Sequence, residues 1–492
     1  MSDDPNAPIN RWKTLDKDLS RVVQLEQATA AISRPMVAIG ISLVFVVVCG
    51  LAAFGLTGQG SGTAIIVAAA VFGAYMALNI GANDVANNMG PAVGANALSM
   101  GGALIIAVVF ETLGALVAGG DVVSTISGGI VAPEAVANPE TFIWAMMAAL
   151  IAAALWLNLA TWFGAPVSTT HSIVGGVMGA GIAAAGFAAV EWGKMGQIAA
   201  SWVVSPILGG AVAALFLAFI KAFINDVPDK LAAARRWVPL LIGVMAGAFA
   251  AYLSMKGLKK IVTIELGQAV MLGTACGFAT WLLFRPIIRR QSAGMENRKR
   301  SLKVLFAVPL IASAALLSFA HGANDVANAV GPLAAIVHAV QDAGTSDKVT
   351  IPLWVMMIGA AGISFGLMLF GPKLIRMVGQ EITKLNPMRA YCVALSAAIT
   401  VIIASGLGLP VSSTHIAVGG VFGVGFYREW HAERRARLLN LQKGKPLSAE
   451  ERRRRKLVRR VHVAGIAAAW VITVPMTALL SALLFLALNG LF

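Results

Sequence analysis

Long apolar runs follow one another along this chain, and short polar or charged stretches separate them. Runs without a charged residue occupy 35–83, 141–190, 390–427 and 461–492. A helix that spans a membrane needs roughly 20 consecutive apolar residues, so each run is long enough to cross a bilayer at least once. The pattern therefore predicts an all-α polytopic membrane protein with roughly ten to twelve spans.

The composition supports this class and excludes others. Hydrophobic residues make up 58% of the 492 positions and charged residues only 12%, whereas soluble domains are near one quarter charged. The three cysteines lie within apolar stretches and form no metal-binding spacing. The chain carries no Walker motif and no pattern that pairs a nucleophile with a base. We therefore expect neither an enzyme nor a bound cofactor.

The positive charge is concentrated in two segments. The net charge is +15; residues 285–303 hold seven Lys or Arg and one acid, and residues 428–460 hold thirteen and four. Both segments connect apolar runs, where a Lys/Arg excess marks the cytoplasmic side of a membrane. This context argues against nucleic acid as a partner, although contact with anionic lipid headgroups stays open.

The number of crossings between the two basic segments must then be even. Residues 304–339 and 351–372 supply one crossing each, so 390–427 has to leave on the side where it enters. Parity thus predicts a re-entrant hairpin over 390–427 and a second one, from the opposite face, over 141–190. The same reasoning places loop 120–141 outside, the N-terminus in the cytoplasm and the C-terminus outside.

Two different motifs each occur twice in the same order. Gly81–Asn87, with the sequence GANDVAN, recurs unchanged at Gly322–Asn328, 241 positions later. Pro166–His171 (PVSTTH) recurs as Pro410–His415 (PVSSTH), 244 positions later. By the predicted topology the two copies run in opposite directions, which indicates two inverted repeats with the site between them, as in secondary transporters.

These repeats give the expected organisation of the chain. We predict a cytoplasmic N-terminal segment (1–35), an extra span (36–60), a first repeat (61–225) with hairpin 141–190, connecting spans with a basic loop (226–303), and a second repeat (304–492) with hairpin 390–427, basic loop 428–460 and a last span over 461–492.

The GANDVAN motif favours a cation site on broken helices. Gly and Asn disfavour helix, and the Gly-Pro that follows each copy is expected to end the helix, so an unwound turn would expose carbonyl oxygens. Carboxylate, amide and carbonyl oxygens are ligands for a small hard cation. The predicted cation ligands are Asn83, Asp84, Asn87, Asn324, Asp325 and Asn328. The alternative is that these side chains only cap the helix ends.

The two hairpin tips favour an anion site. Gly and Pro break the first arm of each hairpin, and Ser or Thr then occupy the N-cap and first turn of the second arm. Hydroxyls, free amides and the helix dipole together bind an anion without a basic side chain. The predicted ligands of a tetrahedral oxyanion are Ser168, Thr169, Thr170, Ser412, Ser413 and Thr414.

One further carboxylate, Glu111, lies within an apolar span and is a candidate for coupling. The spans hold carboxylates but no Lys or Arg, so an anion should bind well only after cations have entered. This order of binding describes symport. The four Asn of the motif favour Na⁺, whereas Glu111, His321 or the two Asp would carry protons if H⁺ were the coupling ion.

Taken together, the two duplicated motifs and the basic loops resemble the inorganic phosphate transporter family over residues 61–492. The resemblance implies a cation-coupled phosphate permease with inorganic phosphate and Na⁺ or H⁺ as ligands, in a bacterial inner membrane, with a homodimer left open. Alternatives with the same fold are a sulfate or metal–phosphate permease and a passive anion channel. An alternative of another class is a receptor or scaffold that acts through 428–460.

Overall fold

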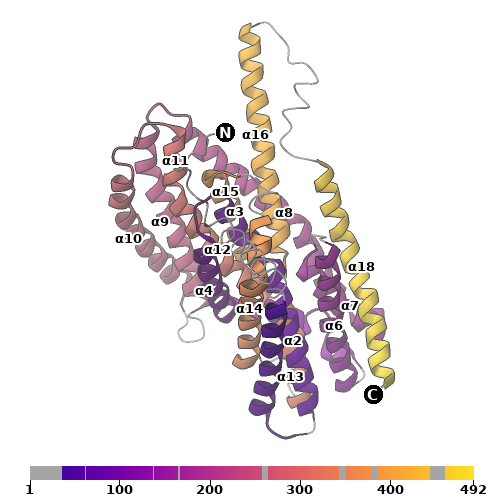
Figure 1. Cartoon of the computed structure of the whole chain (residues 1–492). Helices are drawn as coiled ribbons and strands as arrows, with labels where there is room; N and C mark the ends of the chain where they lie inside the picture. Colours follow the sequence, from indigo (N-terminus) through magenta and orange to yellow (C-terminus); the bar gives the residue numbers. More distant parts are fainter. Residues whose placement is uncertain are drawn as a thin grey trace, which may run out of the picture.

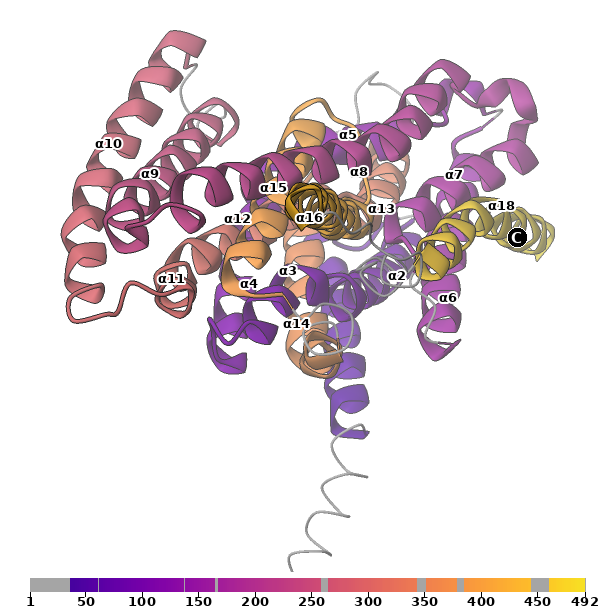
Figure 2. The same ribbon diagram turned by 90° about the horizontal axis from the view of Figure 1, so that it is seen from above.

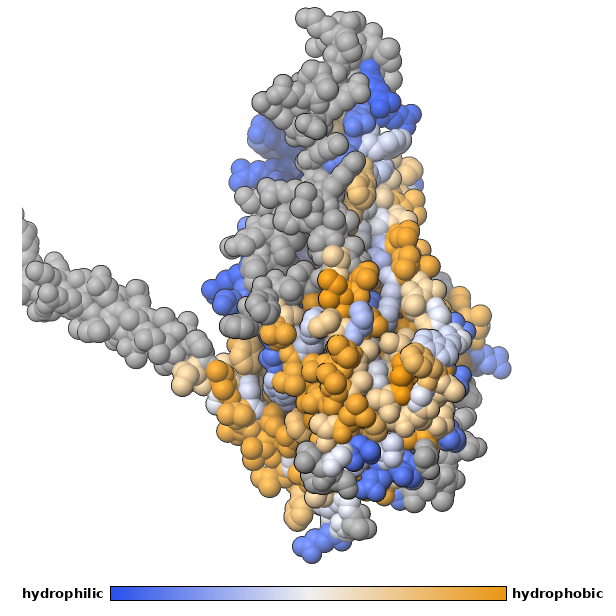
Figure 3. All heavy atoms as spheres, turned by 90° about the vertical axis from the view of Figure 1, so that its right-hand side faces the viewer, coloured by the Kyte–Doolittle hydropathy of each residue, from blue (hydrophilic) through white to orange (hydrophobic). Residues whose placement is uncertain are grey.

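The computed structural model describes residues 36–60, 62–136, 138–163, 167–257, 264–342, 351–377, 385–443 and 460–491. Apart from an isolated bridge between Val131 and Val190, the regular structure of these residues is helical. Eleven of the described helices are long and apolar enough to cross a membrane. Figure 3 shows apolar side chains gathered in the middle of the molecule, with hydrophilic ones toward both ends. The predicted all-α membrane class is confirmed.

In chain order the helices form two halves joined by a pair, and Figure 1 shows the helices of the two halves packed among one another. The first half comprises a helix over Met36–Thr57, α2 (Thr63–Asn83), α3 (Val85–Gly94), α4 (Met100–Ala118), α5 (Gly120–Gly128), α6 (Pro139–Phe163), α7 (Thr169–Ala185) and α8 (Trp192–Ile220), which continues as a π-helix over Lys221–Asn225. The pair is α9 (Lys230–Lys256) and α10 (Leu266–Gln291). The second half comprises α11 (Lys299–Leu305), α12 (Ala307–Asp325), α13 (Ala327–Asp342), α14 (Leu353–Met377), α15 (Pro387–Gly406), α16 (Ser413–Lys443) and α18 (Arg460–Leu491).

The packing between the halves comes in matching pairs. Helix α2 packs on α14 as α12 packs on α4, and α16 packs on α8 as α7 packs on α18. Likewise α6 contacts α13 and α15 contacts α3. Two repeats related by a two-fold axis would produce such reciprocal contacts. Their inverted orientation in a bilayer stays a prediction.

The first glycine of each GANDVAN copy permits this packing. A Cβ on Gly81 would collide with the carbonyl of Ile363 in α14, and one on Gly322 would collide with the carbonyl of Glu111 in α4. Small residues allow the backbones of membrane helices to approach closely. The glycine of the motif therefore serves packing between the halves as well as the local break.

The break at each motif is smaller than the sequence suggests. Only Asp84 separates α2 from α3, with φ −90° and ψ −31°, and only Val326 separates α12 from α13. The expectation that Gly-Pro ends the helix is wrong, because Pro91 lies inside α3 and Pro332 inside α13. Neighbouring helices can satisfy the backbone groups that a proline frees in a membrane protein.

The two predicted hairpins are pairs of helices in contact. Helix α6 packs on α7, and α15 packs on α16. The tips lie between Phe163 and Thr169 and between Gly406 and Ser413, although 164–166 fall outside the described residues. Whether both arms enter and leave on one face of a bilayer stays a prediction.

Several predicted loops are partly helical. Loop 120–141 contains α5, and basic loop 285–303 contains the end of α10 and all but the last residues of α11. Basic loop 428–460 begins as a continuation of α16, which runs to Lys443 because its mixed Glu, Arg and Leu residues are good helix formers. The whole predicted N-terminal segment, 1–35, lies outside the described residues. The same holds for 444–459, which form the rest of the basic loop up to Arg460.

Candidate functional site

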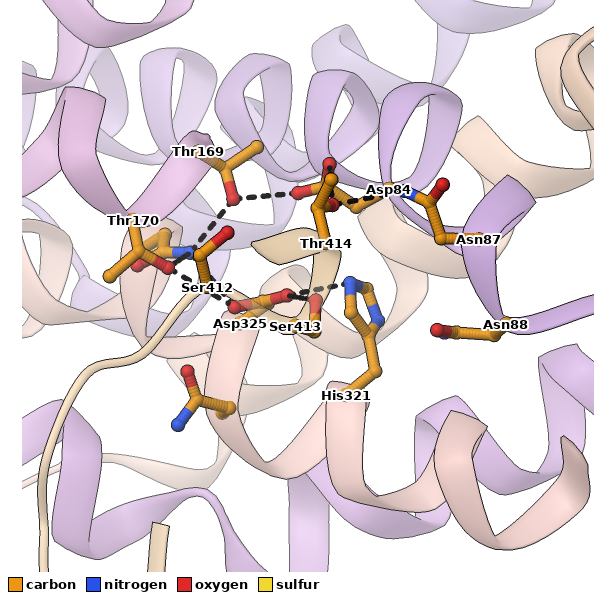
Figure 4. Close-up of polar contacts among 12 residues, drawn as sticks. Asp84, Asn87, Asn88, Thr169, Thr170, His321, Asp325, Ser412, Ser413 and Thr414 are labelled. Atoms are coloured by element: carbon orange, nitrogen blue, oxygen red, sulfur yellow. Dashed lines mark hydrogen bonds and ion pairs between the residues drawn. The ribbon is translucent and has the colours of Figure 1, made fainter. Parts of the chain in front are cut away.

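The hairpin tips and the broken helices meet in one buried centre. Asp84, at the break between α2 and α3, is only 4% exposed. Its carboxylate accepts a hydrogen bond from Thr169 Oγ1 at 2.7 Å and another from Thr414 Oγ1 at 3.2 Å (Figure 4). Thr414 Oγ1 also accepts from Asn87 Nδ2 at 3.0 Å. One carboxylate thus holds a hydroxyl from each tip, although these residues are up to 330 positions apart.

Asp325, at the end of α12, is the equivalent carboxylate of the second repeat. Ser413 Oγ donates to it at 2.9 Å, and Thr170 Oγ1 lies 3.3 Å from it and 3.1 Å from the carbonyl of Val411. Asn328 Nδ2 approaches the Asp325 carboxylate at 3.4 Å. This second carboxylate therefore also contacts both tips, so the centre joins the two halves twice.

The other predicted tip residues act as caps. Ser168 Oγ accepts from the backbone N–H of His171 at 3.2 Å, and Ser412 Oγ accepts from that of His415 at 3.3 Å. These bonds satisfy amides of the first turns of α7 and α16, as the N-cap prediction requires. The imidazole rings of His171 and His415 are tilted by 42° to each other with their centroids 4.6 Å apart, so the two tips lie side by side.

The amides of the motif serve different purposes. Asn324 donates to Ser405 Oγ at 2.9 Å and accepts from the backbone N–H of Val411 at 3.2 Å, so it braces the second tip. Asn87 and Asn328 instead face tip hydroxyls. Asn83 is half-buried and makes no side-chain hydrogen bond within the described residues. The sequence predicts the same role, as cation ligands, for all these amides, but in the structure their hydrogen-bond partners differ.

Glu111 belongs to a buried polar chain that ends at Asp325. Its carboxylate accepts from Asn88 Nδ2 at 2.9 Å and contacts His321 Nδ1 at 2.6 Å. His321 Nε2 in turn lies 2.6 Å from the Asp325 carboxylate. The site predicted from the sequence does not include Asn88, and it includes His321 only as a proton carrier in the alternative with H⁺ as the coupling ion. Their positions directly beside the two motif copies were the available signal.

The centre has the oxygen atoms that a cation requires. A carboxylate oxygen of Asp84, a carboxylate oxygen of Asp325 and a ring nitrogen of His321 all lie within 4.8 Å of one another. Asn328 is fully buried, and its Oδ1 has no hydrogen-bond partner in the described structure. A buried acceptor without a donor is costly, so it favours a ligand that binds through this oxygen. Among the described residues, no Lys or Arg contacts these side chains.

This arrangement defines a class of protein. Buried carboxylates and hydroxyls lie where interrupted helices from two repeats meet, which is how secondary transporters build their ligand sites. In the described chain, this centre brings no cysteine to a second metal ligand. It suits ion and solute transport rather than catalysis.

Comparison with known proteins identifies the family. The model of the phosphate transporter family matches residues 80–481. A candidate phosphate permease of Helicobacter pylori strain J99 is 44% identical, over 96% of this chain and 99% of its own. One from Thermococcus kodakarensis is 38% identical, over 84% and 95%. A solved structure titled "The sodium-dependent phosphate transporter" matches with a TM-score of 0.79 and 35% identity, over 87% of this chain and 100% of its own. This chain belongs to the phosphate transporter family and is a phosphate transporter, not an enzyme.

Proposed function

We propose that the chain imports inorganic phosphate together with Na⁺ by alternating access. The observation that supports this most is the convergence of two carboxylates, two amides and four tip hydroxyls in one buried centre that, within the described residues, no Lys or Arg contacts. A centre with two carboxylates repels a phosphate anion until cations enter. The solved relative's title describes a sodium-dependent transporter, which supports Na⁺ as the coupling ion.

The hydrogen bonds suggest how cation and phosphate binding are coupled. Thr169, Ser413 and Thr414 donate their hydroxyl protons to carboxylates, and a hydroxyl has only one proton to give. A cation on Asp84 or Asp325 would replace those donors as the partner of the carboxylate. The hydroxyls would then be free to donate to a phosphate oxygen at the tips. Cation binding thereby prepares the anion site, and no cofactor is required.

Proton coupling is the second candidate, because one observation favours it. Glu111, His321 and Asp325 form a continuous chain of contacts, each 2.6 Å long, of the kind that carries protons in pumps. In the sodium proposal this chain holds Asp325 in place and Glu111 remains a coupling candidate. In the proton alternative it takes up and releases the coupling ion.

The experiment that separates these ions is phosphate uptake into sealed vesicles. Replacement of Na⁺ by choline at fixed pH should stop uptake, and collapse of the pH gradient at saturating Na⁺ should leave it unchanged. Uptake that continues in choline and follows the proton gradient would contradict the sodium proposal. Excess unlabelled sulfate in the same assay tests whether the tips select phosphate. Flux without any cation gradient would indicate a channel.

A further inference from the structure

A cavity that shares no lining residue with the buried centre lies where the two basic segments meet. It has a volume of about 550 Å³ and is bounded by the end of α8 with its π-helix, by α11, by the first turn of α15 and by the middle of α16. Figure 2 shows α15 and α16 beside α8. Cavities of about 300–1,000 Å³ are of the size that holds a small molecule.

The wall of this cavity is strongly basic. Six Lys or Arg side chains and one acid, Asp226, line it; the six are Lys221, Lys299, Lys303, Arg389, Arg428 and Arg435. Within the described chain, none of these six forms an ion pair with a carboxylate, and Asp226 lies 4.0 Å from His431 instead. Four segments, the π-helix after α8, α11, α15 and α16, therefore bring positive charges together without paired carboxylates to neutralise them.

Some of these groups are also partly withdrawn from water. Lys221, Arg389 and Arg428 are half-buried. Burial lowers the pKa of the Arg428 guanidinium below its ordinary value. The pKa of the His431 imidazole is also lowered, mainly by burial and secondly by the positive charge of Lys221. Clustered cations destabilise the folded protein through mutual repulsion. A cluster that is retained at this cost is expected to be compensated by a bound anion.

We propose that this cavity is a binding site for an anion with several phosphate charges, distinct from the transport centre. One orthophosphate can neutralise only a small part of six cations, whereas a tri- or polyphosphate chain or a phosphate-bearing headgroup reaches several of them. Arg binds phosphate oxygens with two parallel hydrogen bonds, and Lys binds them as a compact charge. The mixture of Arg and Lys around one hollow suits such a ligand better than a carboxylate metabolite with one charge.

The position of the cavity gives the site a regulatory role, which rests on the proposed function. Arg389 lies in the first turn of α15, and Arg428 lies on α16 beyond the tip residues. A bound polyanion would tie both arms of this hairpin to α8 and α11. Since the same hairpin carries Ser413 and Thr414 at its tip, the bound anion would restrain the movement that alternating access requires and slow uptake.

Binding can be tested without transport. The full-length protein, purified in detergent, is titrated with inorganic triphosphate by calorimetry, and compared with Arg389→Gln/Arg428→Gln and with Arg428→Gln alone. The matched control is Arg290→Gln/Arg434→Gln, which removes two exposed positive charges that do not line the cavity. We expect the wild type and the control to bind alike, the double variant to bind at least tenfold more weakly, and added salt to weaken binding.

The source of the phosphate groups is distinguished in nanodiscs. A soluble ligand predicts that triphosphate binds equally in discs with and without phosphatidylglycerol. A lipid ligand predicts that phosphatidylglycerol abolishes triphosphate binding and copurifies with the wild type more than with Arg428→Gln. Equal triphosphate affinity of wild type and both cavity variants, or no triphosphate binding together with equal lipid retention, would overturn the proposal. Since phosphate uptake is not measured here, failure of the transport mechanism cannot imitate either outcome.

Discussion

The carboxylate of Asp325 offers the sharpest test of the proposed cation site. Asp325 is 1% exposed, and its carboxylate accepts hydrogen bonds from the hydroxyls of Ser413 at 2.9 Å and Thr170 at 3.3 Å. The Nε2 atom of His321 lies 2.6 Å from it. Asp325→Asn keeps the shape and removes the charge. Hydroxyl groups can turn to donate or accept, so the amide can be accommodated and the protein should still fold.

The expected loss follows from the distance over which a cation would act. Two unit charges about 4 Å apart interact by roughly 4 kcal/mol at an effective dielectric constant of about 20. The ligand atoms of Asp84, His321 and Asp325 lie within 4.8 Å of one another, so a cation in the centre would be at or inside this range. Since about 1.4 kcal/mol is a tenfold change in affinity, Asp325→Asn should weaken Na⁺ binding by roughly a thousandfold. Asp84→Asn should act in the same way.

The assay combines uptake of labelled phosphate with stabilisation of the purified protein by Na⁺. Both variants should lose Na⁺-driven uptake and the Na⁺-dependent rise in melting temperature, while remaining monodisperse. The control is Asp121→Asn, which removes a carboxylate that is 48% exposed and pairs with Lys256 at the end of α9. If Asp325→Asn or Asp84→Asn transports like the wild type with the same Na⁺ dependence, the centre does not bind the coupling ion.

Two further predictions concern the tips and the topology. Thr414→Val and Thr169→Val each remove a hydroxyl that, in the proposed mechanism, donates to a phosphate oxygen once the cation has bound. The loss of one such hydrogen bond costs about 1–3 kcal/mol, so the half-saturating phosphate concentration should rise roughly ten- to a hundredfold. The control is Thr400→Val, which removes only the hydrogen bond from Thr400 to the carbonyl of Ser396 within α15. It should leave the half-saturating phosphate concentration unchanged; a rise there too would indicate a general effect of Thr→Val changes on packing. In a chain without its native cysteines, Glu134→Cys should react with an impermeant reagent from outside and Ala293→Cys only from the cytoplasm. Labelling of both from one face would refute the inverted topology.

The sequence predicted correctly that the duplicated motifs come together, but it predicted the local backbone conformation of the GANDVAN motifs less well. Duplication and charge located the two GANDVAN segments and the two tips, and the structure brings all four together. The helix breaks were overestimated, because propensity describes an isolated helix, whereas α14 and α4 hold the motif segments of α2 and α12 nearly helical. Tertiary packing here outweighs the local preference of Gly and Asn.

The pairing of individual side chains could not be predicted. Whether an Asn faces a hydroxyl, as Asn87 does, or braces a tip, as Asn324 does, depends on the register between segments 81–330 positions apart. Periodicity fixes the face of a helix but not its rotation and height against a distant partner. The contact of His321 with Asp325 is local, because the two residues are one turn apart on α12. The contact of Glu111 with His321 arises in the same way as those of the amides, because α4 and α12 meet only in the complete fold.

The duplicated motif hides an asymmetry that the contacts bring out. His321 directly precedes the second GANDVAN copy, where the first copy has Ile80, and Asn88 follows the first copy, where the second has Ala329. Asp325 therefore shares a buried network with an imidazole and a second carboxylate, whereas the side chains that donate hydrogen bonds to the Asp84 carboxylate in the described structure are hydroxyl groups from the tips. A hydroxyl donor compensates a buried charge less than an imidazole that can take up a proton does. Asp84 thus depends more on an external cation, so the two halves, although alike in sequence, should bind their cations with unequal affinity.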